Sequence, residues 1–303
     1  MIGSTRTTEP KTERASMTTS HLISIAGIAM SLLAGSGHHE GSADARAEEP
    51  QRPAASGNYA NVNGLRMYYE TRGEGEPLVL LHGAFGLAMD LPALAKNRRV
   101  ITVELQGHGH TADIDRPLSV EQMADDTAAL LKELKIERAD FFGYSMGGVV
   151  ALGVAIRHPS LVRKLAINGS YFGSVEAAFE PEAFKQFRNL PADFAPPMLK
   201  APYDKVAPDP TKWPTLVAKI KKASMEFKGF ARDDLKAIKA PVLITLGDRD
   251  GIRPEHVVEM FRLIPGSELA IIPGADHFLI FQSPEKLLPM IAAFFEAPVS
   301  AKR

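Results

Sequence analysis

The sequence predicts an α/β fold in which a mostly parallel central sheet carries helices on both faces. Apolar runs that resemble buried strands alternate along the chain with stretches of helical periodicity. Several apolar runs end in glycine-containing turns, which suits strands that meet loops at one edge of a sheet. Strands that alternate with helices favour parallel pairing, because each parallel connection crosses a face of the sheet.

The folded unit is expected to begin near residue 58 with a hairpin. Asn63-Gly64 lies between two runs of alternating apolar residues, and this pair suits a two-residue hairpin turn. The continuous apolar runs 77–83 and 98–109 then predict two buried strands.

A helix is expected over residues 119–136. Ser119 followed by Gln122 predicts a capping box, and apolar residues follow at helical spacing. A strand at 139–145 and a helix of small residues that ends at Pro159 come next. The remaining predicted elements are strands within 161–169, 240–250 and 267–277 and a closing helix at 284–297.

Residues 170–235 interrupt this alternation, because they show no strand signal. They hold the only tryptophan and seven of the 15 phenylalanines: Phe172, Phe179, Phe184, Phe187, Phe194, Phe227 and Phe230. Residues 215–227 carry an apolar stripe at helical spacing. We therefore expect a helical cap or lid inserted into a core formed by residues 58–169 and 236–303. A long insertion that merely completes the core is the alternative.

Composition narrows the classes of function. The chain has 303 residues, is 45% hydrophobic and carries a formal net charge of -1, so no basic surface for nucleic acid or anionic membrane is indicated. It contains no cysteine, which excludes disulfides, zinc-thiolate sites, iron–sulfur clusters and a cysteine nucleophile. The oligomeric state is left open by the sequence.

The N-terminal residues 1–47 are interpreted as a signal peptide or leader. Lys11 and Arg14 precede the apolar stretch 22–35, which is too short to span a bilayer, and Ala45-Arg46-Ala47 has the form of a cleavage site. We expect the leader to direct export to the periplasm or the medium. If the leader does not function, we expect the protein to stay in the cytoplasm. Residues 48–57 are interpreted as a linker.

Ser145 is the candidate nucleophile. It occupies the centre of Gly-x-Ser-x-Gly, between the predicted strand 139–145 and the helix that follows. A serine on such a tight turn is pushed out above the sheet, and its neighbours have to be small because strand and helix nearly touch. Gly143, Gly147 and Gly148 meet this requirement.

A serine hydroxyl needs a base and an orienting acid. His277 follows a predicted strand, and two acids, Asp248 and Asp250, follow another, so that serine, acid and histidine occur in this order. The other histidines of the predicted folded unit are expected to be structural or, for His158 and His256, on the surface.

Backbone N–H groups are expected to stabilise an oxyanion. One belongs to Met146, directly after the serine, and the other to the loop His82-Gly83-Ala84-Phe85, with Ala84 preferred and Phe85 second. His82 is expected to hold this loop by hydrogen bonds.

Five segments in this order (LLHGAFG, VELQGHGHT, GYSMGG, LITLGDRDGIRPEH and IIPGADHF) resemble the α/β-hydrolase superfamily. The chain is similar over residues 58–296 to small serine esterases, enol-lactonases and cofactor-free haloperoxidases or perhydrolases. The resemblance implies the α/β-hydrolase fold, Asp250 as the triad acid, and Ala84 and Met146 as oxyanion donors. It also implies that no metal or organic cofactor is required.

The reaction expected from this resemblance is hydrolysis of a small or medium carboxylic ester through an acyl-enzyme. Side chains expected to contact this small-molecule substrate are Phe85, Tyr144, Phe172, Trp213 and Phe278. Lactone opening, perhydrolysis and carbon–carbon bond hydrolysis remain alternatives on the same triad, although Ala84-Phe85 departs from the bulky residue and proline of many perhydrolases. A low-turnover ligand receptor of the same fold is a further alternative.

Overall fold

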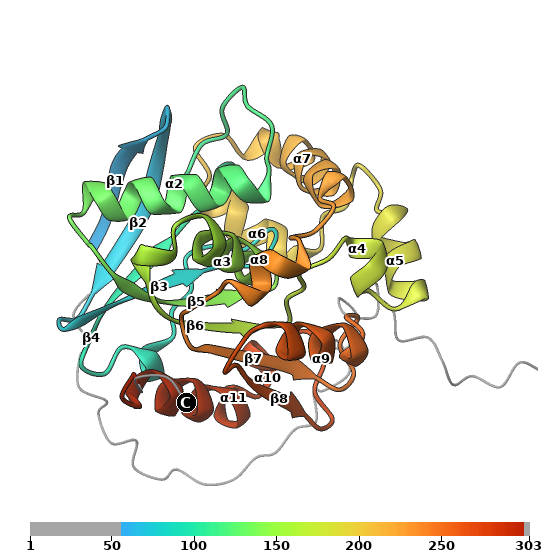
Figure 1. Ribbon diagram of the computed structural model, residues 1–303. Coiled ribbons are helices and arrows are strands. Elements are labelled where there is room, and N and C mark those ends of the chain that lie inside the picture. The colour runs from blue at the N-terminus through green and yellow to red at the C-terminus, as the bar shows by residue number, and fades with distance from the viewer. Residues whose placement is uncertain (1–55, 300–303) are drawn as a thin grey trace, which may run out of the picture.

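The computed structural model of this protein describes residues 56–299 (Figure 1). The leader and nearly all of the linker expected from the sequence lie outside the described residues. Within 56–299, no helix combines the length and the apolar character that crossing a membrane would require.

One eight-stranded sheet forms the centre of the molecule, with the strand order β1-β2-β4-β3-β5-β6-β7-β8. β1 pairs antiparallel with β2 and β2 antiparallel with β4, whereas all other neighbours are parallel. The bounds are β1 Ser56–Val62, β2 Leu65–Arg72, β3 Glu76–Leu81, β4 Arg98–Val103, β5 Ala139–Tyr144, β6 Val162–Asn168, β7 Val242–Gly247 and β8 Glu268–Ile272. The α/β class and mostly parallel sheet predicted from the sequence are thus confirmed.

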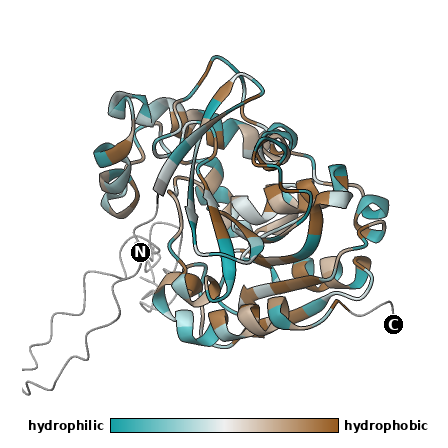
Figure 2. Ribbon diagram, turned by 90° about the vertical axis from the view of Figure 1, so that its left-hand side faces the viewer, coloured by the Kyte–Doolittle hydropathy of each residue, from teal (hydrophilic) through white to brown (hydrophobic). Residues whose placement is uncertain are grey.

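Helices cover both faces of this sheet (Figure 1). α2 (Val120–Glu133), α3 (Met146–Arg157) and α9 (Pro254–Leu263) share one apolar core with the sheet, and η1 (Pro92–Leu94), α10 (Leu279–Gln282) and α11 (Pro284–Glu296) share the other. Alternate strand residues divide between the two cores: Phe141 faces the first and Phe142 the second. Figure 2 shows the hydrophobic residues concentrated along the central strands.

The hairpin predicted at Asn63-Gly64 is confirmed. These two residues separate β1 from β2 and have φ values of 48° and 80°. The capping box predicted for α2 forms only in half. The Ser119 side chain accepts the N–H of Gln122 at 3.1 Å, but the Gln122 side chain donates to Asp126 at 3.0 Å and does not return to Ser119. The bond to the buried Asp126 carboxylate therefore orients the Gln122 side chain along the helix and away from Ser119.

Residues 169–241, all of which the structure describes, connect β6 to β7 through helices without a strand. These are α4 (Val175–Ala178), α5 (Pro181–Arg188), α6 (Pro197–Val206), η3 (Pro210–Lys212), α7 (Trp213–Glu226) and α8 (Arg232–Lys236). A third apolar cluster lies in this segment and includes Phe85 of the loop after β3. The inserted helices thus pack directly on the loop where an oxyanion donor is expected.

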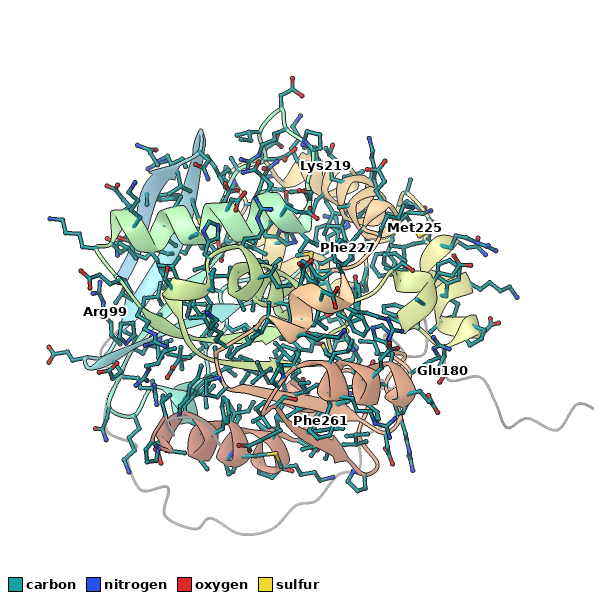
Figure 3. All side chains as sticks on the ribbon, in the orientation of Figure 1. Arg99, Glu180, Lys219, Met225, Phe227 and Phe261 are labelled. Carbon is teal, nitrogen blue, oxygen red and sulfur yellow. The ribbon has the colours of Figure 1, made fainter. Side chains whose placement is uncertain are left out.

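One lysine ties the inserted helices to the core. Lys219 of α7 donates to the carboxylate of Asp113 and to the carbonyl oxygens of Ile114 and Arg116, each at 2.9 Å (Figure 3). Because a charged ammonium group satisfies three acceptors of one core loop, α7 is held to the core by more than apolar packing.

Candidate active site

Ser145 lies on a strained turn between β5 and α3. Its backbone angles are φ 53° and ψ -121°, a region that side-chain-bearing residues rarely adopt. Two neighbours brace the turn. The Ser145 N–H donates to the carbonyl oxygen of Asn168 at 2.9 Å, and the Ser170 hydroxyl donates to the carbonyl oxygen of Ser145 at 2.9 Å. The last residue of β6 and the loop after it therefore hold the serine turn in this conformation.

The positions around Ser145 have room only for glycine, because neighbouring atoms lie too close for a Cβ. A Cβ on Gly143 would collide with the backbone of Gly147, one on Gly147 with the backbone of Leu81, and one on Gly148 with the Ser170 hydroxyl. The expectation that strand and helix nearly touch at these positions is confirmed.

Three side chains that are distant in sequence meet above the carboxyl ends of the parallel strands. The distance from Ser145 Oγ to His277 Nε2 is 2.9 Å. The opposite ring nitrogen, His277 Nδ1, lies 2.9 Å and 3.0 Å from the two carboxylate oxygens of Asp250. With a proton on Nδ1, the imidazole donates to Asp250 and its Nε2 is free to accept the serine proton.

Asp250 and Asp248 occupy different environments. The Asp250 carboxylate also accepts the N–H of Ile252 at 3.0 Å, and the residue is 8% exposed. The Asp248 carboxylate accepts the N–H of Ala275 at 3.3 Å and braces the turn before His277. The structure thus brings Asp250, and not Asp248, to the histidine.

A glycine also supports the base. Gly169 follows β6 with φ 59°, and a Cβ there would lie 3.1 Å from the His277 ring and 3.2 Å from Asp250 Oδ2. Any side chain at this position would press on the hydrogen-bonded pair.

The charge of the surroundings favours an imidazolium at His277. Burial lowers the pKa of this histidine, but the negative charges of Asp250 and, more weakly, Asp276 outweigh burial and raise the pKa above its ordinary value. A base with a raised pKa binds a proton more strongly, which suits proton transfer from a serine hydroxyl.

The two N–H groups predicted as oxyanion donors have no protein partner. Among residues 56–299, neither the N–H of Ala84 nor that of Met146, the first residue of α3, donates to another protein group. The N–H of Phe85 is occupied, because it donates to His108 Nε2 at 3.3 Å. Of the two loop candidates, Ala84 is therefore the one with an available donor.

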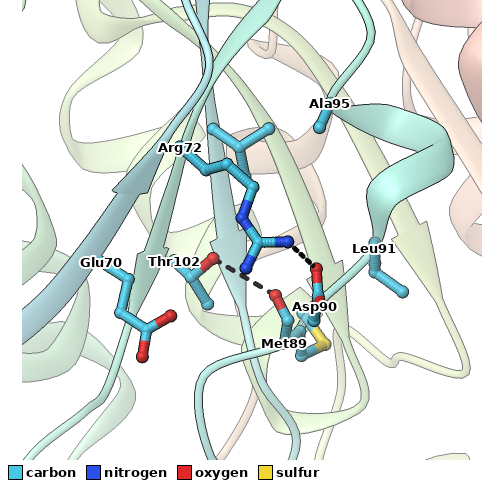
Figure 4. Close-up of a pocket in the computed structure, with 8 residues that line it drawn as sticks. Glu70, Arg72, Met89, Asp90, Leu91, Ala95 and Thr102 are labelled. Carbon is cyan, nitrogen blue, oxygen red and sulfur yellow. Dashed lines mark hydrogen bonds and ion pairs between the residues drawn. The ribbon is translucent and has the colours of Figure 1, made fainter. Parts of the chain in front are cut away.

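Several contacts anchor the loop that carries Ala84. His82, as expected, holds the loop by hydrogen bonds: its Nε2 accepts the N–H of Leu105 at 3.1 Å, and its Nδ1 lies 2.8 Å from the carbonyl oxygen of Gly83. Further along, Arg72 pairs with Asp90 at 2.7 Å around a small pocket beside β2 and β4 (Figure 4). Both ends of the loop are thereby tied to the sheet.

The buried histidines of this region make stability depend on pH. Burial lowers the pKa of His82 to about 4 and that of His108 to about 3, and their ring nitrogens accept backbone N–H groups as neutral imidazoles. Since the unfolded chain protonates at its higher pKa, stability is fully present above pH 6.5 and falls as the pH drops toward these values. We expect each histidine to contribute a slope of about 1.4 kcal/mol per pH unit in the free energy of unfolding.

Urea unfolding between pH 7 and pH 4.5 measures this slope. His256→Gln should reduce the slope by the contribution of one proton, about 1.4 kcal/mol per pH unit. The reason is that burial and then the charge of Arg253 lower the pKa of His256 to about 4. Equal slopes in wild type and His256→Gln would contradict the assignment.

The prediction that His256 lies on the surface is wrong. This residue of α9 is 5% exposed, stacks on Phe172 with ring centroids 4.4 Å apart, and accepts the N–H groups of Phe172 and Gly173. Helical periodicity predicted the helix but not its buried face, because the partner loop comes from a segment more than 80 residues earlier.

The residues expected to contact substrate lie in three places. Phe85 and Trp213 pack against each other with centroids 5.5 Å apart, and the Trp213 indole donates to the carbonyl oxygen of Phe194 inside the third cluster. Phe172 stacks on His256. Tyr144 and Phe278 both lie beside His277, with ring centroids 5.3 Å and 6.0 Å from its imidazole. Their contact with substrate stays a prediction.

The sequence predictions missed Ser170 and Gly169 as supports of the site, and they took His108 as structural without its partner. For Gly169 and Ser170 a signal was present, since Asn-Gly-Ser follows the strand next to the one that carries Ser145. No sequence signal identified the partner of His108, the N–H of Phe85, because only the fold brings the two residues together. In the described part of the chain, no group of three or more His, Cys, Asp or Glu side chains is arranged to hold a metal ion.

Comparison with known proteins agrees with this arrangement. Residues 78–289 match the alpha/beta hydrolase family. The chain is 32% identical over 276 residues to the dihydrolipoyllysine-residue acetyltransferase component of the acetoin cleaving system of Pseudomonas putida, covering 83% of this chain and 72% of that protein. It is 29% identical over 226 residues to a pimeloyl-acyl-carrier-protein methyl ester esterase of Neisseria meningitidis, covering 68% of this chain and 86% of that protein.

A solved structure shows the same similarity in three dimensions. The enol-lactonase of Burkholderia xenovorans LB400 superimposes with a TM-score of 0.63 at 25% identity, covering 79% of this chain and all (100%) of that one. Since the family match spans most of the described sheet and the site geometry lies within it, the chain belongs to the alpha/beta hydrolase family.

Proposed function

We propose that this protein is a serine hydrolase that cleaves small to medium carboxylic esters through an acyl-enzyme intermediate. The observation that carries the proposal is the continuous hydrogen-bonded series from Ser145 Oγ through His277 to Asp250, with its distances of 2.9 Å and 2.9 to 3.0 Å. This order of groups turns a weak hydroxyl nucleophile into a reactive one.

In the acylation step Ser145 Oγ attacks the ester carbonyl carbon while His277 Nε2 accepts the hydroxyl proton. Asp250 holds the Nδ1–H and stabilises the imidazolium. His277 then gives the proton to the departing alkoxide oxygen, so that an alcohol leaves and the acyl group remains on Ser145. A water molecule repeats the sequence, and the carboxylic acid is released.

Negative charge develops on the carbonyl oxygen in both steps. The free N–H groups of Ala84 and Met146 are proposed as its donors, and the latter opens α3, so the helix dipole adds to the stabilisation. Because Phe85 packs into the inserted helices, we propose that the cap fixes the position of Ala84 as well as covering the site.

The same groups would serve lactone opening, perhydrolysis or hydrolysis of a carbon–carbon bond next to a carbonyl. The similarity to a methyl ester esterase and to an enol-lactonase supports the ester assignment. The similarity to a 2-hydroxymuconate semialdehyde hydrolase keeps carbon–carbon bond hydrolysis as the second candidate. Export through the leader remains a separate proposal from the sequence.

A substrate panel with active-site labelling tests the proposal. Turnover of p-nitrophenyl esters of increasing acyl length is compared with that of lactones, of vinylogous diketones and of esters in the presence of hydrogen peroxide. A fluorophosphonate label is mapped by mass spectrometry in parallel. We expect ester turnover to exceed the others and the label to lie on Ser145.

Three other outcomes would contradict the ester-hydrolase assignment or the mechanism. Faster turnover of diketones or lactones would replace the ester assignment. A burst of one equivalent of alcohol, with the acyl group retained, would favour a ligand receptor. A label on any residue other than Ser145 would contradict the mechanism itself.

A further inference from the structure

Tyr144 lies where the Ser145 turn, the His277 loop and the loop after β3 meet. It is the last residue of β5, directly before Ser145, and its hydroxyl donates to the carbonyl oxygen of His277 at 3.0 Å. Its ring lies with its centroid 5.3 Å from that of His277. On another side it faces Gly83 of the loop after β3, where a Cβ would come within 3.0 Å of the tyrosine ring.

The hydrogen bond from Tyr144 is the one that holds the main chain of His277. Within residues 56–299, no other hydrogen bond involves the backbone N–H or carbonyl oxygen of this histidine. The imidazole itself bonds only to the side chains of Ser145 and Asp250. Hydrogen bonds of Asp248 and Asp276 brace the residues on either side, and the Tyr144 hydroxyl is the one group that bonds the main chain of His277 directly.

The environment of Tyr144 keeps this donor in place. The residue is 6% exposed, and Phe281 packs edge-on against it with centroids 5.3 Å apart. Burial, and then the charges of Asp250 and Asp276, raise the pKa of the phenol well above its ordinary value. The hydroxyl thus stays protonated, and its acceptor is a carbonyl group that does not titrate.

We infer that Tyr144 is a positioning residue, whose hydroxyl fixes the main chain of His277 so that Nε2 stays within hydrogen-bond distance of Ser145 Oγ. This inference rests on the proposed serine-hydrolase function. It replaces the substrate contact expected for Tyr144 from the sequence. The physical reason is that a base displaced by a fraction of an ångström loses much of its efficiency in proton transfer.

The test is Tyr144→Phe, which keeps the ring and removes only the hydroxyl. We expect kcat to fall about tenfold with KM changed less than about twofold, because an orienting group and not a binding group is lost. A substrate contact would instead raise KM. The matched control is Tyr68→Phe, at a tyrosine 8% exposed whose hydroxyl bonds Glu70 on β2, and it should leave both constants unchanged.

A second measurement does not depend on turnover. The Nδ1–H of His277 is followed by NMR in substrate-free protein, and its exchange with water should be about tenfold faster in Tyr144→Phe than in wild type. Phe281→Ala removes the exposed ring that covers Tyr144 and should produce a smaller change in the same direction. This variant serves as the test if Tyr144→Phe does not fold.

The outcomes separate this inference from the proposed function. Loss of ester turnover and of Ser145 labelling in wild type would overturn the function, and the imidazole exchange rate would still decide the role of Tyr144. An unchanged kcat and an unchanged exchange rate in Tyr144→Phe would overturn the inference while leaving the function intact. A raised KM with kcat unchanged would also overturn it, in favour of a substrate contact.

Discussion

Ser145→Ala is expected to lower kcat by about 10⁶-fold, since removal of a triad nucleophile removes the covalent pathway. The measurement is ester hydrolysis under saturating substrate, with active-site titration to exclude contamination by wild-type enzyme. The effect should be large because Ser145 Oγ is the atom that bonds His277 Nε2, at 2.9 Å. A residual kcat within about 100-fold of wild type would rule out Ser145 as nucleophile.

A second substitution at position 145 distinguishes the catalytic role of the hydroxyl from the effect of backbone strain on stability. Ser145 has φ 53° and ψ -121°, a conformation that costs serine and alanine free energy but is accessible to glycine. Ser145→Gly should therefore be as inactive as Ser145→Ala and more stable than it by about 1 kcal/mol, after the larger backbone entropy of glycine is counted. Urea unfolding at pH 7 measures the difference. A glycine variant less stable than the alanine variant would show that the turn is not strained.

Asp250→Asn is expected to lower kcat by about 10³- to 10⁴-fold, whereas Asp248→Asn lowers it less than about fivefold. The amide at 250 can donate to Nδ1 of His277, which favours the tautomer that carries its proton on Nε2 and cannot accept from Ser145. Asp248 lies two residues away and accepts the N–H of Ala275, so its replacement is a matched control. Similar losses in the two variants would contradict the choice of Asp250.

The pH profile gives Asp250→Asn a second signature. In wild type the raised pKa of His277 places the acid limb of kcat/KM above the ordinary histidine value. Loss of the Asp250 charge leaves burial, which lowers the pKa, opposed only by Asp276. The acid limb of the residual activity should therefore move to lower pH. An acid limb that does not move would mean that another group controls it.

The accuracy of the sequence predictions varied with the range of the interactions involved. The hairpin at Asn63-Gly64 and the strand–turn–helix around Ser145 depend on residues close in sequence, and both appear as expected. Gln122 was expected to complete a capping box, but its side-chain NH₂ donates to Asp126 one turn further along the helix, and its oxygen does not accept the N–H of Ser119. His256 was misplaced because its burial depends on a loop from the inserted segment.

The sequence by itself determined the α/β class, the order of the candidate groups along the chain and the glycines that surround Ser145. These follow from local periodicity and from side-chain size, which neighbouring residues dictate. Only the tertiary structure decided that Asp250 rather than Asp248 meets His277, that Phe85 gives its N–H to His108, and that the Tyr144 hydroxyl holds the His277 backbone. Each of these is a contact between loops at the ends of different strands. Strand register and sheet order bring such loops together, and no single segment of the sequence encodes them.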